Sequence, residues 1–174
     1  MSRKVISIGL DTKDINRAIR ELNLYKQEIM KKVEIYKEKI ADAIAEEAQA
    51  NFSNAMIDDT VPGGTRKADV NVSVSEHGDI LVIVADGEDA VWCEFGAGVY
   101  HNSPVGSSPH PKGAELGFTI GSYGKGYGKA TAWGYYDESD KLVITRGTPA
   151  SMPMYNAAQT VAAKAIQIAK EVWG

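Results

Sequence analysis

An apolar run that ends in alternating glycines decides the fold of this chain: Val91-Trp92-Cys93-Glu94-Phe95-Gly96-Ala97-Gly98. A second informative stretch lies nearer the C-terminus: Thr145-Arg146-Gly147-Thr148-Pro149-Ala150-Ser151-Met152-Pro153-Met154-Tyr155-Asn156-Ala157. The first predicts a strand that turns out of a sheet at its glycines, and the second predicts a strand end, a turn and a helix start. Two rigid pieces separated by a long segment favour a protein whose loop contacts another molecule.

The segment between them, residues 96–134, is rich in glycine. It holds ten of the 17 glycines and three of the six prolines of the chain. Because its backbone entropy is too large to be offset by its own contacts, we expect this loop to become ordered on a neighbouring molecule. Its aromatic and basic side chains suit stacking on single-stranded nucleic acid or docking in a groove of another protein. These loop residues are Tyr123, Lys125, Tyr127 and Lys129.

A long helix is predicted in the N-terminal third. Apolar residues recur at steps of three, four and seven between Ile15 and Phe52, and no glycine or proline interrupts residues 14–61. Residues 11–14 supply capping side chains, and a break near Asn23 is left open. The charged face is expected to be solvated or to touch a partner. A helix of this length outreaches one small sheet, so part of it is expected to pack on a neighbouring subunit.

Strands are expected on both sides of the glycine-rich loop. Residues 5–10 read as a short strand-like opening. Valines alternate with polar residues over 70–75, residues 76–79 form a hairpin turn, and 80–85 form the partner strand. After a further turn, Val91–Phe95 would complete an antiparallel meander.

The C-terminal part predicts one more strand pair and a closing helix. The pair comprises residues 133–136 and 141–145. The helix is expected to have Ser151 as its N-cap, with Pro153 tolerated in its first turn. Val61-Pro62-Gly63-Gly64 is read as the end of the long N-terminal helix.

Composition narrows the class of protein. At 174 residues with 44% apolar content, the chain predicts a single domain, residues 1–174, with a sizeable core. The net charge of −4 is small and has the wrong sign for a dedicated binder of phosphate backbones. The single cysteine, Cys93, is interpreted as a small buried hydrophobe. Without a membrane-spanning run or a signal peptide, an intracellular, soluble protein is expected.

No catalytic, metal or cofactor site is predicted. Gly128-Lys129 lacks the preceding glycine and following hydroxyl of a phosphate loop, and Gly96-Ala97-Gly98 lacks the third glycine of a dinucleotide-binding turn. The acidic turn at 86–89 is interpreted as solvated, and no Gly-x-Ser-x-Gly elbow is present. The histidines lack metal-binding spacing and are expected at the surface. They are His77, His101 and His110.

The quoted stretches together resemble the tail-completion (head–tail joining) family of long-tailed phage neck proteins, often labelled minor capsid proteins. The resemblance rests on Glu94-Phe95-Gly96-Ala97-Gly98, on Trp133-Gly134-Tyr135-Tyr136 after a variable loop, and on the Thr-x-Gly-x-Pro-Ala and Met-Tyr-Asn-Ala segments within 145–157. It covers roughly residues 14–174 in the order and type of elements. The family often carries His where Arg146 stands, so no role is transferred to that position.

The resemblance implies an α+β fold, with an antiparallel β-sheet packed against a long N-terminal helix and a C-terminal helix, and an extended glycine-rich loop at 96–132. It implies a non-enzymatic virion protein that assembles as a ring, commonly a hexamer, and completes the tail or joins it to the head. Its partners would be other copies, connector, neck and tail-tube proteins, with DNA at most passing through the lumen and no membrane contact. The alternatives are a small nucleic-acid-binding phage protein that uses the Lys/Tyr/Gly loop, and a hydrolase without a recognisable motif.

Interface and structural roles are predicted where the first stretch leaves the sheet and where the second leads into the closing helix. Glycine would free the backbone at the turn. The alternative for Gly96 and Gly98 is that they simply mark the end of a strand. The residues concerned are Glu94, Phe95, Gly96, Gly98, Trp133, Gly147, Pro149, Ala150, Met154 and Tyr155.

Overall fold

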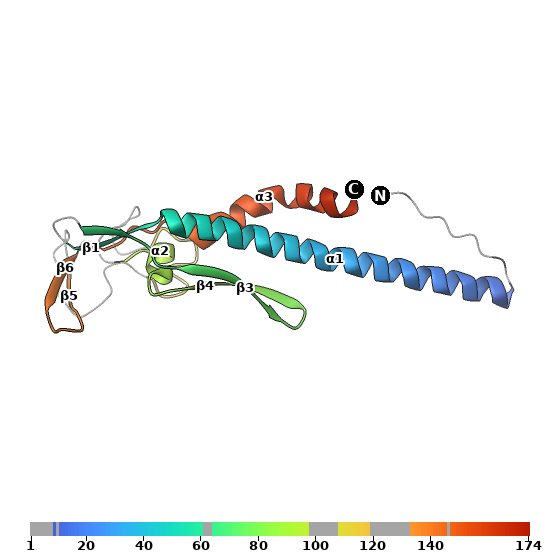
Figure 1. The fold of residues 1–174 in the computed structure, drawn as a ribbon, viewed down its shortest axis with the longest axis horizontal. Coiled ribbons are helices and arrows are strands. Elements are labelled where there is room, and N and C mark those ends of the chain that lie inside the picture. The colour runs from blue at the N-terminus through green and yellow to red at the C-terminus, as the bar shows by residue number, and fades with distance from the viewer. Residues whose placement is uncertain (1–8, 10, 61–63, 98–107, 119–132, 146) are drawn as a thin grey trace.

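The fold consists of a very long N-terminal helix, a shorter C-terminal helix beside it, and three small hairpins at one end (Figure 1). The computed structural model describes residues 9, 11–60, 64–97, 108–118, 133–145 and 147–174. Helix α1 spans Thr12–Asn54 and helix α3 spans Pro153–Trp173. The predicted α+β class, with antiparallel β-structure against two helices, is confirmed.

Helix α1 is continuous, without a break at Asn23. Its N-cap is Asp11, whose side chain accepts a hydrogen bond of 2.8 Å from the backbone N–H of Asp14, as predicted. It ends at Asn54, earlier than predicted, because the next residues form the first hairpin. That hairpin pairs β1 (Met56–Thr60) with β2 (Gly64–Lys67) and was not predicted.

The other two hairpins match the predicted strands. Strand β3 (Asn71–His77) pairs with β4 (Ile80–Asp86), and Gly78 takes a φ of 62° in the two-residue turn between them. Strand β5 (Trp133–Tyr136) pairs with β6 (Leu142–Thr145). Each hairpin is a separate two-stranded sheet in the described part of the chain, so the predicted meander is wrong. The strand-like reading of residues 5–10 falls largely outside the described residues.

The third strand expected in that meander is the short helix α2, Ala90–Phe95. Ala90, Cys93 and Glu94 are buried, whereas Val91 and Trp92 are exposed. Buried positions three and four residues apart follow the helical period, not the alternation of a strand. A run of five residues, four of them apolar, fits both templates, which is why the sequence pattern alone misassigned it.

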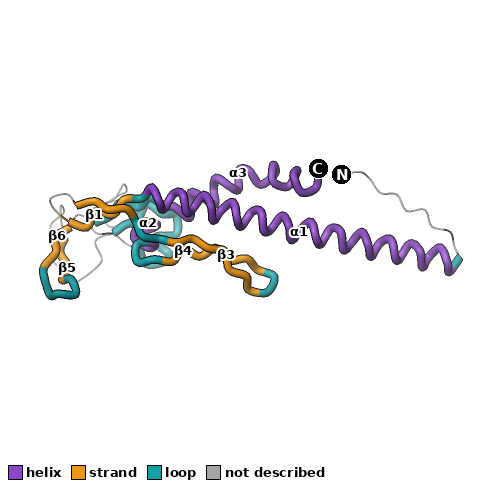
Figure 2. Tube along the Cα trace, in the orientation of Figure 1, coloured by secondary structure: helices purple, strands orange, loops and turns teal. Residues whose placement is uncertain are grey.

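The core lies where the end of α1, the first two hairpins, α2 and the start of α3 meet (Figure 2). Half-buried Ala68, Val72, Ala85 and Met154 pack around it. Its buried members are Phe52, Ala55, Ile57, Val70, Ala90 and Cys93.

Helix α3 runs antiparallel to α1 but covers only its C-terminal half (Figures 1 and 2). At one end Asn51 Nδ2 donates to Pro153 O at 3.2 Å. At the other end the Tyr36 ring contacts the Trp173 ring, with centroids 5.2 Å apart. Residues 12–35 of α1 therefore extend about 36 Å beyond the helix pair, at 1.5 Å per residue. We call this segment the α1 arm.

Candidate functional site

The two stretches that carry the sequence resemblance meet at the start of α3. We call this contact between residues 93–97 and residues 147–155 the Glu94 junction. Cys93 O accepts backbone hydrogen bonds from Ser151 N at 2.8 Å and Met152 N at 3.1 Å. Ala97 and Thr148 exchange backbone hydrogen bonds of 2.8 and 3.0 Å. Segments about 50 residues apart are thus locked together by main-chain contacts.

Glu94 supplies the helix cap that the sequence pattern assigned to Ser151. Its two carboxylate oxygens accept from Met154 N at 2.8 Å and from Tyr155 N at 2.9 Å. These N–H groups belong to the first turn of α3, which has no partners within the helix. Ser151 lies one residue before the true N-cap, Met152, and donates to Cys93 O instead. The prediction for Ser151 is wrong because the negative charge arrives from α2.

His110 is the third hydrogen-bond partner of the Glu94 carboxylate. Its Nδ1 accepts from Lys112 N at 3.1 Å, so Nε2 carries the proton and donates to Glu94 Oε1 at 3.2 Å. The exposed fraction of His110 is 8% and that of Glu94 is 7%. The prediction of a surface histidine is wrong for His110. Nothing in the local spacing reveals a contact between residues 16 positions apart.

Aromatic rings close the junction around His110. Phe95 lies 4.6 Å from His110 and stacks on Phe118 at 4.1 Å, centroid to centroid. Tyr155 meets His110 edge-on at 5.4 Å. Ser108 Oγ also donates to Phe95 O at 2.6 Å. Residues 108–118 of the glycine-rich segment therefore contact their own chain. The expectation that the loop becomes ordered on a neighbouring molecule concerns mainly residues 98–107 and 119–132, which lie outside the described residues.

Glycine is required at the point of closest approach. Gly96 has a φ of 80°, and a Cβ placed there would lie 3.1 Å from Ala150 N and 3.3 Å from Ala150 Cβ. Gly147 also has a left-handed backbone, with a φ of 86°. Ala150 is buried and Pro149 half-buried in the segment leading to α3.

Met154 belongs to the junction through its backbone N–H, whereas other residues of interest lie away from the junction or outside the described residues. Met154 packs against the core. Trp133 is the first residue of β5, and its backbone pairs with Thr145. The remaining positions, Gly98, Tyr123, Lys125, Tyr127 and Lys129, fall outside the described residues.

The acidic turn holds an ion pair. The Arg66 guanidinium donates to both oxygens of Asp89, and Asp69 N donates at 2.9 Å. Burial acts to raise the pKa of Asp89, but these hydrogen bonds and the positive charge outweigh it and lower the pKa. Asp89 therefore anchors β2 to the start of α2 and is not the freely solvated turn residue that we predicted.

The other features to consider in the described residues are a reactive thiol, a metal site and a membrane-spanning helix. Burial raises the pKa of the Cys93 thiol to about 12, so the thiolate nucleophile is suppressed, consistent with its interpretation as a small hydrophobe. Groups of three or more metal-ligating side chains are absent from the part of the chain that the structure describes. Among its helices, none is both long and apolar enough to cross a membrane.

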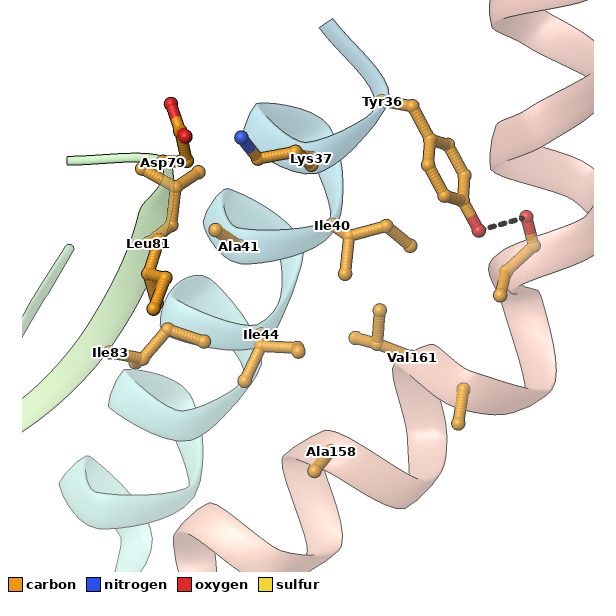
Figure 3. Close-up of a pocket in the computed structure, with 13 residues that line it drawn as sticks. Tyr36, Lys37, Ile40, Ala41, Ile44, Asp79, Leu81, Ile83, Ala158 and Val161 are labelled. Carbon is orange, nitrogen blue, oxygen red and sulfur yellow. Dashed lines mark hydrogen bonds between the residues drawn. The ribbon is translucent and has the colours of Figure 1, made fainter. Parts of the chain in front are cut away.

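A second candidate surface is an open apolar groove of about 500 Å³. Helix α1 runs between β4 and α3, with Ile40 and Ile44 directed toward Val161 and with Leu81 on the opposite side (Figure 3). Lys37 and Asp79 contribute the charged groups of the lining. Sequence reasoning missed this groove, because it depends on how the hairpin and α3 straddle the helix.

Comparison of the chain with models of protein families, with curated proteins and with solved structures found no match.

Proposed function

We propose that this chain is a non-enzymatic structural virion protein of the phage neck or tail end, which joins head to tail or completes the tail as a ring of identical copies. The resemblance of the two junction stretches to tail-completion proteins motivates this proposal. The observation that carries it furthest is the α1 arm. A helix extends far beyond the body of its own chain while exposing large apolar side chains, which suits assembly with other molecules.

Four of the exposed apolar residues of the arm follow the same stripe that packs on α3 further along. Between 39% and 52% of Ile15, Ile19, Leu22 and Val33 is accessible. Isolated helices are marginal in water, and most helical stability in proteins comes from packing of the apolar face. The arm therefore gains stability when another molecule covers it.

The Glu94 junction contributes rigidity to such an assembly. It ties the segment after α2, where the glycine-rich segment begins, to the start of α3. We propose that the junction residues act as structural supports for the subunit contact, and not as groups that react with a substrate.

Deletion of the coding sequence from the phage genome that carries it tests this function. We expect separate heads and tails, or tails of aberrant length, in electron micrographs, with joining restored by the gene supplied in trans. Normal infectious particles from the deletion would contradict the proposal. Salt-sensitive DNA binding by a monomer would favour the alternative, a nucleic-acid-binding protein that uses the Lys/Tyr/Gly loop.

A further inference from the structure

We infer that the α1 arm of one copy docks in the apolar groove of a second copy. The inference deepens the proposed function and rests on its claim that copies of this chain assemble with one another. It names the two surfaces that meet and predicts that the contact is head to tail.

The arm presents one continuous apolar stripe. Ile15, Ile19, Leu22, Ile29 and Val33 follow one another at steps of four, three, seven and four. The stripe continues through Tyr36 and Ile40, where α3 covers it within the chain. The half that α3 does not reach, in which Ala18 is buried and the larger Ile15, Ile19 and Leu22 are exposed, is thus an extension of a helix–helix contact that this face already makes.

The groove has dimensions that suit a helix. Its α1 lining runs from Tyr36 to Ile44, about 12 Å along the helix axis, which matches roughly two turns of a docked helix. The α3 wall contributes the small side chains of Ala158, Ala162 and Ala165, which leave space for a close approach. The β4 wall contributes larger apolar side chains, Ile80 among them, which is 65% exposed.

An arm that docks in this groove must belong to another molecule. Helix α1 is unbroken from Thr12 to Asn54, so the arm cannot fold back onto residues 36–44 of the same helix. The arm and the groove are also different surfaces. We infer a heterologous contact, which repeats from copy to copy and generates a ring when the rotation closes.

Charge favours the same pairing. Residues 12–35 hold six Lys or Arg and four Asp or Glu, whereas the rest of the chain holds 13 and 19. The arm therefore carries a net positive charge, and the body to which it would dock carries a net negative one. Complementary potentials of this kind steer association and weaken as salt is added.

Two variants and two matched controls test the inference by sedimentation velocity. L22E places a charge on the arm stripe, and L24E places the same charge on the other side of the helix, at a residue that is already 64% exposed. A162R fills the groove, whereas A163R changes the neighbouring exposed residue outside it. Circular dichroism of each variant confirms that it is folded.

We expect wild type, L24E and A163R to form the same assembly, and L22E and A162R to sediment as monomers. An equimolar mixture of L22E and A162R should form dimers and nothing larger. In that mixture the intact arm of A162R meets the intact groove of L22E, and no further contact can follow.

Three outcomes would overturn the inference. If the wild type is a monomer at every concentration, including one stabilised by residues 1–10 of its own chain, no second copy binds the arm. Assembly of L22E like wild type would exclude the arm. Assembly of A162R like wild type, with no dimers in the mixture, would show that arms pair symmetrically.

The phenotype of the particle tests the proposed function separately. If L22E is monomeric and still supports normal particles, the proposed function is refuted, while the contact between arm and groove stands.

Discussion

Glu94 shows how one side chain can join distant parts of this chain. Its carboxylate, on α2, receives two N–H groups of α3 and the imidazole of His110. Hydrogen bonds to a charged acceptor are stronger than neutral ones, and buried N–H groups left without an acceptor are costly. Glu94 therefore links α2, the start of α3 and the segment that contains His110.

Replacement of Glu94 by Ala should destabilise the fold by about 2–4 kcal/mol, because two helix N–H groups and the His110 donor lose their acceptor. Glu94→Gln should lose less, since its amide keeps one acceptor oxygen. Urea unfolding followed by circular dichroism measures both. A loss below about 0.5 kcal/mol for the Ala variant would contradict the capping role.

Two matched substitutions, Gly96→Ala and Gly117→Ala, separate the two reasons for glycine at position 96. These reasons are its left-handed backbone and its close approach to Ala150. Gly96 and Gly117 have φ values of 80° and 81°, but a Cβ would meet Ala150 only at Gly96, and nothing lies within 4 Å at Gly117. Both substitutions to Ala incur backbone strain of about 1 kcal/mol, and Gly96→Ala should cost more through the clash. Equal changes in the free energy of unfolding would show that the close approach to Ala150 is unimportant.

The Asp89–Arg66 pair predicts a pH dependence with a definite sign. Because the pKa of Asp89 is lower in the folded state than in the unfolded state, its stabilisation is complete above the unfolded pKa of about 3.9. It is lost as the pH falls below that value through the folded pKa. The stability difference between wild type and Asp89→Asn should therefore be constant near neutral pH and shrink below about pH 4. A difference that grows on acidification would contradict this assignment.

At the scale of elements, α1 consists of two halves with different surroundings. The C-terminal half is covered by α3 and the β3–β4 hairpin, whereas the arm has neither beside it (Figure 1). Regions with few buried apolar contacts open at low free energy and exchange their amide hydrogens quickly. The arm and the covered half should therefore behave differently in solution.

Hydrogen–deuterium exchange measures that difference. In monomeric L22E, amides of residues 16–32 should exchange faster than those of residues 40–52, and wild-type assembly should protect the arm. Mass spectrometry of peptides from both halves follows the exchange. Uniform protection along α1 in the monomer would mean that the arm is already covered.

The sequence allowed some elements to be predicted better than others. The apolar period of α1 and the Gly78 turn between β3 and β4 are local signals, and both led to correct assignments. The Val91–Phe95 run was ambiguous because a run of five residues, four of them apolar, fits a strand or a helix. The cap of α3 failed for another reason: Glu94 lies 60 residues before Met154, and no local pattern encodes such a contact. The burial of His110 was missed on the same grounds.

At the scale of the whole molecule, the chain combines a rigid junction, a projecting helix and a groove that its own arm cannot reach. The arm carries a net positive charge, and the rest of the chain carries a net negative one. Together they favour a protein that functions as one of several identical copies. In the function that we propose, these copies would form a ring at the junction of head and tail.

The most direct measurement is the native mass of the purified chain over a range of concentrations. A closed ring predicts a single discrete species at a whole-number multiple of 18.8 kDa, which persists on dilution and carries no nucleic acid. A species of 18.8 kDa at every concentration would contradict the account.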